Sequence, residues 1–118
     1  MKYNLPFAEM FLDDIKAGIK TQTRRPVTID DISPAGIFRC RYGSRGFEVR
    51  SGNIKLEIVS TRLERLHDIS ESDKLAEGAT TERPFGTIWS EVYKSYNHCW
   101  ENNPWVWVIE FNYLGMTQ

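Results

Sequence analysis

Apolar residues recur at helical spacing near the start of the chain. They predict a helix over residues 7–17, and they are Ala8, Phe11, Leu12, Ile15 and, just beyond it, Ile19. Gly18 follows as a natural C-terminal cap. The Thr-rich segment 20–25 then stops before a proline, which is typical of a short strand.

Alternation of apolar and polar residues predicts strands in the middle of the chain. In residues 54–66, IKLEIVSTRLERL, the residues Ile54, Leu56 and Ile58 share one face. The phase shifts at Ser60-Thr61, which indicates a β-bulge. Shorter strands are expected at 37–42 and 47–50, on either side of a Gly-containing turn, and 27–35 is expected to be a loop.

Helix signals return in the last third of the chain. Ser70 with Asp73 three residues later resembles a capping box, and the helix that it starts should end near Glu77 because Gly78 follows. Apolar and aromatic residues at helical spacing predict a second helix over 85–96, after Pro84, with Trp89, Tyr93 and Tyr96 in the core. Residues 105–114, WVWVIEFNYL, alternate as a final strand.

This order of elements favours one α+β domain over residues 1–118, with a curled sheet of mixed or antiparallel strands flanked by helices. In the final strand, Trp105 and Trp107 share one face with Ile109 and Phe111, and both tryptophans are expected in the core.

Charge is distributed unevenly along the chain. Residues 1–65 hold 12 Lys or Arg against 8 Asp or Glu, whereas residues 66–118 hold 3 against 8. A net charge of −1 makes long duplex DNA an unexpected partner, but a basic face in the first half could meet a short or single-stranded ligand. The oligomeric state stays open.

Cysteine and histidine usage indicates neither a disulfide framework nor a metal site. Cys40 and Cys99 are far apart and are expected to be reduced thiols in a cytoplasmic protein. His67 and His98 have no cysteine partners at ligand spacing, so no metal or cofactor is expected. No apolar run is long enough for a membrane span, and acidic residues interrupt the apolar N-terminal stretch, which argues against a signal peptide.

Three segments in order resemble the ASCH domain family of the PUA-like group. Residues 18–25, GIKTQTRR, resemble its G-x-K-T-x-T-x-R signature. Residues 56–78 resemble its long strand followed by D-I-S and a helix that ends in A-E-G, and residues 103–111, NPWVWVIEF, resemble its last strand. The resemblance implies a PUA-like β-barrel flanked by helices, with a cleft for RNA or a modified nucleoside.

The resemblance also implies candidate site residues. Small bacterial members hydrolyse N4-acetylcytidine with a lysine, a threonine and a glutamate, which correspond by motif to Lys20, Thr23 and Glu77. The alternative is an RNA-binding module without turnover. Residues expected to bind the substrate or RNA are Thr21, Arg24, Arg25 and Trp100.

The chemistry of these residue types is compatible with amide hydrolysis. A threonine hydroxyl needs a base to become a nucleophile, and a lysine can be that base when burial or neighbouring cations lower its pKa. Lys20 and Thr23 would point to opposite faces of a regular strand, so Lys20 has to precede the strand or sit at a bulge. The same alternation means that one of Arg24 and Arg25 faces a cleft. Trp100 is the best candidate for an exposed stacking aromatic.

Overall fold

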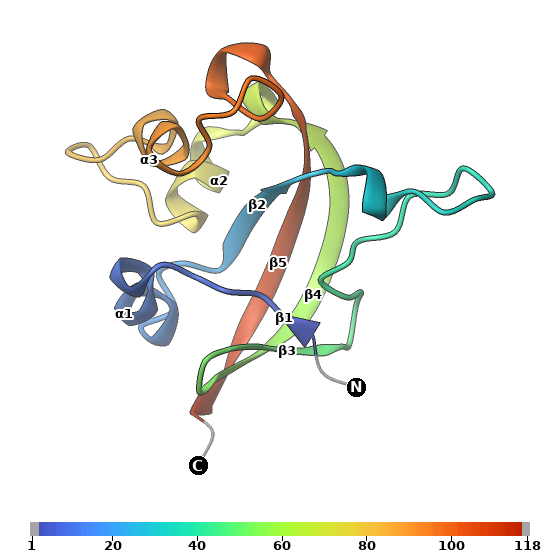
Figure 1. Cartoon of the computed structure of the whole chain (residues 1–118). Helices are drawn as coiled ribbons and strands as arrows, with labels where there is room; N and C mark the ends of the chain where they lie inside the picture. Colours follow the sequence, from blue (N-terminus) through green and yellow to red (C-terminus); the bar gives the residue numbers. More distant parts are fainter. Residues whose placement is uncertain (1–2, 117–118) are drawn as a thin grey trace.

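A computed structural model of the chain describes residues 3–116, built around a curved five-stranded sheet in the order β1-β3-β4-β5-β2 (Figure 1). The long strands β4 (Ile54–Arg65) and β5 (Trp105–Met116) pair antiparallel. β2 (Gln22–Pro26) and β3 (Glu48–Ser51) extend this sheet antiparallel on either side. The two-residue β1 (Tyr3–Asn4) adds a parallel edge.

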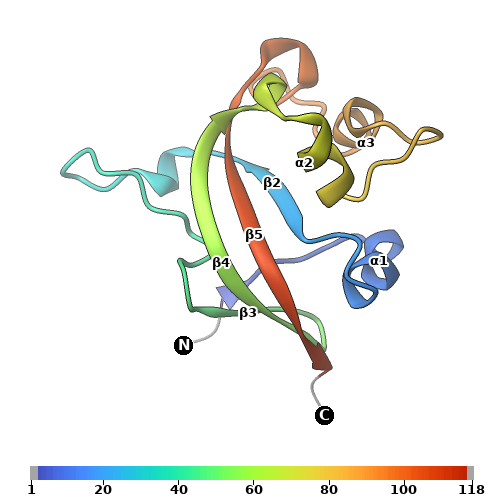
Figure 2. The same ribbon diagram turned by 180° about the vertical axis from the view of Figure 1, so that it is seen from behind.

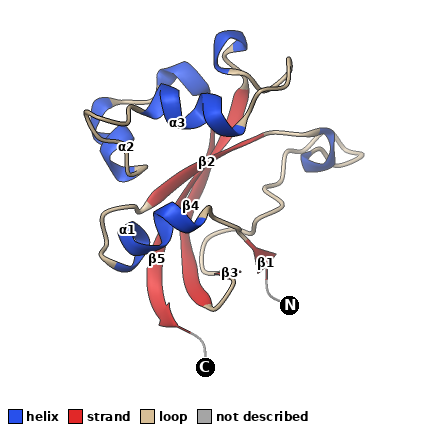
Figure 3. Cartoon of the chain, turned by 60° about the vertical axis from the view of Figure 1, so that its left-hand side comes forward, coloured by secondary structure: helices blue, strands red, loops and turns tan. Residues whose placement is uncertain are grey.

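Helical segments cover the two sides of β2, as Figures 2 and 3 show from other directions. A 3-10 turn η1 (Glu9–Phe11) leads into α1 (Leu12–Lys16) on one side. On the other side lie α2 (Glu71–Ala76) and α3 (Phe85–Val92). Further 3-10 turns are η2 (Ile29–Asp31), η3 (Leu66–Asp68) and η4 (Trp100–Asn102).

The two faces of the sheet bury separate cores. Along β5, Trp107, Ile109 and Phe111 enter a cluster with β3, β4 and α1, here called the α1 core. Val106 and Val108 point the opposite way into a cluster with α3, here called the α3 core. Because successive strand residues alternate between faces, the near-continuous apolar run of β5 serves both cores at once.

The predicted α+β class is confirmed, but the expected closed barrel is wrong. The strand order ends at β1 and β2, and these two edges do not pair with each other. β1 is too short to complete a barrel: after Leu5 donates to the Arg50 carbonyl, Pro6 has no N–H to extend the ladder, and the chain turns into η1. Within residues 3–116 the sheet is therefore open, with a free edge on β2.

Most predicted elements are present. β3, β4, α2 and β5 confirm the strands and helix expected there, and the bulge in β4 falls between Ile58 and Ser60. The strand expected at 37–42 is wrong, since Phe38 forms only an isolated bridge. Buried Asp31 fixes this loop instead, because its main-chain oxygen accepts from the Arg39 N–H at 2.7 Å.

Two aromatic residues expected in the core lie at the surface. α3 ends at Val92, and the Trp89 indole donates to the His98 carbonyl at 2.8 Å, which folds the following loop back over the helix end and leaves Tyr96 82% exposed. Trp105 is 50% exposed at the start of β5, with the Arg65 guanidinium 4.6 Å above its ring. Among residues 3–116, no helix has the length and apolar character to cross a membrane.

Candidate functional site

Lys20 lies before β2 rather than within it. Gly18 ends the helical segment with a positive φ of 76°, and the main-chain N–H groups of Ile19 and Lys20 both donate to the Asp14 carbonyl, at 2.9 and 3.1 Å. Regular strand pairing begins at Gln22. Lys20 therefore precedes the strand, as the sequence required. Strand alternation does not force its side chain onto the face opposite Thr23.

Glu77 is brought to Lys20 by the end of α2. The Ser70 hydroxyl caps this helix by accepting from the Asp73 N–H at 3.1 Å, as the sequence predicts. Gly78, with φ +91°, then turns the chain, and an added Cβ there would lie 3.7 Å from the Lys20 Cβ. This close approach leaves Glu77 only 5% exposed, unlike a helix-end acid that faces water.

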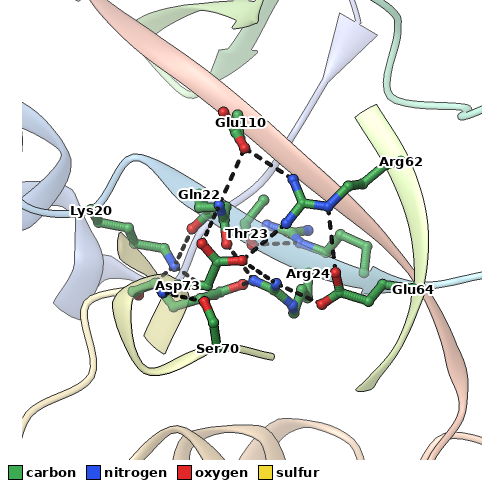
Figure 4. Close-up of polar contacts among 11 residues, drawn as sticks. Lys20, Gln22, Thr23, Arg24, Arg62, Glu64, Ser70, Asp73 and Glu110 are labelled. Carbon is green, nitrogen blue, oxygen red and sulfur yellow. Dashed lines mark hydrogen bonds and ion pairs between the residues drawn. The ribbon is translucent and has the colours of Figure 1, made fainter. Parts of the chain in front are cut away.

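Lys20, Glu77 and Arg24 form the centre of a buried ion cluster. Figure 4 shows Lys20 and Arg24 within it. The Lys20 ammonium donates to the Glu77 carboxylate at 3.1 Å, to the Glu77 carbonyl at 2.6 Å and to the Gln22 carbonyl at 3.0 Å. The other Glu77 carboxylate oxygen is 3.1 Å from Arg24 Nη1. All three ammonium protons are therefore used, and one carboxylate bridges two cations.

Further acidic residues surround Arg24 and complete this cluster. Its Nη2 lies 2.9 Å from Glu64 and 3.1 Å from Asp73. Arg62 in turn pairs with Asp73 at 2.9 Å and with Glu110 at 3.0 Å. Partial burial disfavours the charged form of Asp73, but hydrogen bonds from Gln22 and Arg24 outweigh it and lower its pKa.

Burial acts most strongly on the Lys20 ammonium. Desolvation lowers the pKa of Lys20 below its usual value of 10.5, against the opposing charge and hydrogen bond of Glu77, and Arg25 and Arg24 lower it further. Phe11 lies beneath the ammonium, with 4.7 Å between Nζ and the ring centroid. A lysine with a lowered pKa reaches its neutral, basic form at a lower pH than a solvated lysine does.

Thr23 and Arg25 lie on the opposite face of β2 from Arg24. Thr23 pairs with Ile109 and Arg25 with Trp107, so both face the α1 core. Arg25 Nε donates to the Thr23 hydroxyl oxygen at 3.3 Å, and its guanidinium lies 5.0 Å from the Phe7 ring centroid. A cationic donor on a hydroxyl oxygen favours the alkoxide that forms when the proton leaves.

Residues from both faces of β2 line a small cavity of about 140 Å³. Its polar lining consists of Lys20, Thr23, Arg24, Arg25 and Glu77. Its aromatic lining consists of Phe7 and Phe11 from the α1 side and Phe85, Trp89 and Tyr93 from the α3 side. Because the cavity lies at the edge of β2, both arginines line it, although only one was expected to face a cleft.

Two predicted binding residues lie outside this cavity. Thr21 is exposed, and its main-chain N–H donates to the Ala76 carbonyl at 2.9 Å. Trp100 is half-buried, 4.4 Å from the His67 ring and 6.1 Å from the Phe85 ring between centroids. Neither residue lines the space that Lys20, Thr23 and Glu77 share.

The sequence did not indicate two parts of the site: the aromatic lining of the cavity, and the acidic residues Glu64 and Asp73 that pair with Arg24. Helical spacing placed Trp89 and Tyr93 in a core, which is close to their position, but gave no sign that a cavity lies beside them. No pattern joins Glu64 or Asp73 to Arg24, because the three come from different elements. A larger hollow of about 1000 Å³ lies elsewhere, beside Ile29, and none of the ionic site residues lines it.

Comparison with known proteins supports the fold. No protein-family model matches the sequence, and no curated protein matches it. Among solved structures, protein EF3133 from Enterococcus faecalis V583, described under DUF984, has a TM-score of 0.71 at 14% identity over 100% of this chain and 83% of its own. An ASCH domain from Lactobacillus crispatus JV V101 has a TM-score of 0.64 at 16% identity over 93% of this chain and 77% of its own. The chain therefore has an ASCH-like fold.

Proposed function

We propose that this protein is an amidohydrolase that acts on an N4-acylated cytosine, as a nucleoside or within RNA. The observation that carries the proposal is the meeting of Lys20, Thr23 and Glu77 at one cavity with aromatic walls. Aromatic rings suit the flat faces of a base, and a buried lysine beside a hydroxyl suits acyl transfer. The ASCH-like fold is compatible with this chemistry but does not establish it.

The reaction divides into acylation and hydrolysis. Neutral Lys20 takes the proton of the Thr23 hydroxyl as this oxygen attacks the acyl carbon. The bond from the acyl carbon to N4 then breaks, Lys20 returns the proton to N4, and cytidine leaves while Thr23 carries an ester. Water attacks the ester with Lys20 again as the base, which releases the carboxylic acid and restores the threonine.

Neighbouring groups support these roles. Desolvation already lowers the pKa of Lys20, so its neutral form is more accessible than that of a solvated lysine. Glu77 holds the ammonium in place through its carboxylate and its carbonyl, at 3.1 and 2.6 Å. Arg25 donates to the Thr23 oxygen and thereby stabilises the negative charge that develops there.

The size of the cavity limits what is bound inside it. Its volume of about 140 Å³ is below the ~300–1,000 Å³ that is usual for pockets enclosing drug-sized ligands. It therefore suits a single pyrimidine base and a small acyl group, with the ribose outside. Such an arrangement is compatible with either a free nucleoside or a base turned out of an RNA strand.

A non-catalytic RNA-binding module is the second candidate. The Lys20 ammonium is fully hydrogen-bonded to three oxygens, and such a satisfied cation serves binding as well as catalysis. Arg25 lies at the same cavity with its guanidinium over the Phe7 and Tyr42 rings. This module would hold a base in the cavity without turnover.

The deciding experiment follows the conversion of N4-acetylcytidine to cytidine by chromatography, with Thr23→Val as the key variant. Valine keeps the shape of threonine and removes only the hydroxyl, so turnover should be lost, whereas Thr23→Ser should retain it. Thr61→Val is the matched control, because Thr61 and Thr23 both pair with Ile109 from opposite sides of β5, and Thr61 does not line the cavity. Turnover by Thr23→Val would remove Thr23 from the mechanism. Absence of turnover in the wild type, together with binding of cytidine, would favour the binding module.

A further inference from the structure

A large groove lies next to the cavity, and the proposed function does not use it. The hollow beside Ile29, here called the Trp105 groove, has a volume of about 1000 Å³. Its walls come from β4, from β5, from the loop that follows β2 and from the segment that precedes β5. Trp105, Phe38 and Ile29 line it and are 50%, 45% and 79% exposed. Exposed apolar side chains gathered at one hollow mark a binding surface.

The Trp105 groove adjoins the cavity along one face of the sheet. Arg25 and Trp107 pair across β2 and β5, and their side chains lie on the face of the α1 core. Two residues further along, the Val27 N–H donates to the Trp105 carbonyl at 3.1 Å, and Trp105 pairs with Arg65. Arg25 lines the cavity, whereas Val27, Trp105 and Arg65 line the groove. The two rows of side chains are therefore neighbours, about 7 Å apart at the rise of a β-strand.

The charge of the Trp105 groove complements an anionic partner. No Asp or Glu lines it, and Arg65 does. The Arg65 guanidinium lies 4.6 Å from the centroid of the Trp105 ring and donates to the Asn103 carbonyl at 3.2 Å. Within residues 3–116 it forms no ion pair, whereas Arg62 on the opposite face of β4 pairs with three acids. An exposed tryptophan beside an unpaired arginine suits both the base and the phosphate of a single strand.

We propose that the Trp105 groove binds the nucleotide next to the base held in the cavity, so that the substrate is a single-stranded RNA rather than a free nucleoside. The neighbouring base stacks on Trp105, its phosphate lies at Arg65, and Phe38 and Ile29 offer apolar contacts. A spacing of about 7 Å between the two rows is close to the step between neighbouring nucleotides of an extended strand, so one strand reaches both sites.

This inference rests on the proposed function for the base in the cavity. It selects between the free nucleoside and the RNA strand, with which the small cavity alone is equally compatible. The apolar walls of the Trp105 groove would also suit a second copy of this chain. The unpaired Arg65 and the lining without acids favour an anionic strand, because complementary charge selects the partner.

Calorimetric titrations of the wild type with cytidine and with the RNA trinucleotide UCU test the inference. Because stacking of one further base on an aromatic ring adds to the affinity, UCU should bind about tenfold or more tightly than cytidine. Trp105→Ala should remove most of this advantage, whereas Trp105→Phe should retain much of it because a ring remains. Tyr96→Ala is the matched control, since Tyr96 is an exposed aromatic residue that lines neither the groove nor the cavity.

Salt dependence tests the part of Arg65. Each phosphate contact contributes about −0.7 to the slope of log K against log salt for a single strand, so Arg65→Gln should reduce the slope for UCU by about 0.7. Lys94→Gln removes the same charge at an exposed position outside the groove, and it should leave the slope nearly unchanged.

The outcomes separate this inference from the hydrolase proposal. Equal affinity for cytidine and UCU, an advantage of UCU that survives Trp105→Ala, or no binding of either at millimolar concentration would each overturn it, even if free N4-acetylcytidine is hydrolysed. If sedimentation then shows a dimer that Trp105→Ala dissociates, the groove is an interface between copies. A preference for UCU that depends on Trp105 and Arg65 would support the inference, even if turnover is absent and the hydrolase proposal fails.

Discussion

Replacing Glu77 by glutamine tests whether the buried ion cluster stabilises the fold. Glutamine keeps the shape of the side chain and an oxygen acceptor, but it removes the charge between Lys20 and Arg24, each 3.1 Å away. Arg24 retains Glu64 and Asp73, whereas Lys20, which is 3% exposed, loses the one ion-pair partner that it has among residues 3–116. Removing one partner of a buried ion pair costs about 3–5 kcal/mol, and the lower end applies because glutamine still accepts a hydrogen bond.

The assay is urea and thermal unfolding at neutral pH, followed by tryptophan fluorescence. At roughly 3–5 °C per kcal/mol for a chain of this length, Glu77→Gln should lower the Tm by roughly 10–15 °C. Glu71→Gln is the matched control on α2, because the Glu71 side chain is 90% exposed and forms a surface ion pair with Lys74. This control should leave the Tm unchanged within error.

A Tm within about 2 °C of the wild type for Glu77→Gln would refute the reasoning, since it would mean that Lys20 is solvated or already neutral. Lys20→Met in the Glu77→Gln background separates these cases. If the unpaired Lys20 ammonium causes the loss of stability in Glu77→Gln, Lys20→Met should recover part of that stability. The double variant holds no unpaired cation at position 20. Lys20→Ala should likewise destabilise the fold, since Lys20 is buried and ion-paired.

Three further outcomes are expected. Trp107→Ala should destabilise by about 3–5 kcal/mol, because it empties a buried site in the α1 core, whereas Trp105→Ala at the exposed start of β5 should have a much smaller effect in the same denaturant titration. The pKa of Asp73 is lowered in the folded state, so ionised Asp73 contributes to the free energy of unfolding above pH 3.8. This contribution is lost as the pH falls through the lower pKa of the folded state. In Asp73→Asn, the free energy of unfolding should therefore depend less on pH in this acidic range. Turnover should rise with pH through a lysine pKa below 10.5, and a rate that falls over this range would exclude Lys20 as the base.

The long strands and α2 could be predicted because their signals are local. The apolar residues of β4 and β5 alternate with period two, and β5 contributes to a core on each face as that pattern requires. Ser70 and Gly78 mark the two ends of α2 through hydrogen-bonding and backbone preferences that act over a few residues. The predictions were wrong where contacts between residues further apart in the chain determine the structure. Examples are the strand expected at 37–42, where Asp31 holds a loop instead, and Tyr96, which is exposed rather than in the core.

By itself, the sequence determined the alternating faces of β4 and β5 and both ends of α2, and it placed the candidate residues Lys20 and Thr23 beside the start of β2. Only the tertiary structure decided that Glu77 reaches Lys20 and that Glu64 and Asp73 enclose Arg24, because these contacts join residues 40 to 57 positions apart. It also decided that the sheet stays open, with the free edge of β2 at a cavity. The physical reason is that burial and ion pairing depend on which elements pack together, whereas alternation and capping depend on neighbours along the chain.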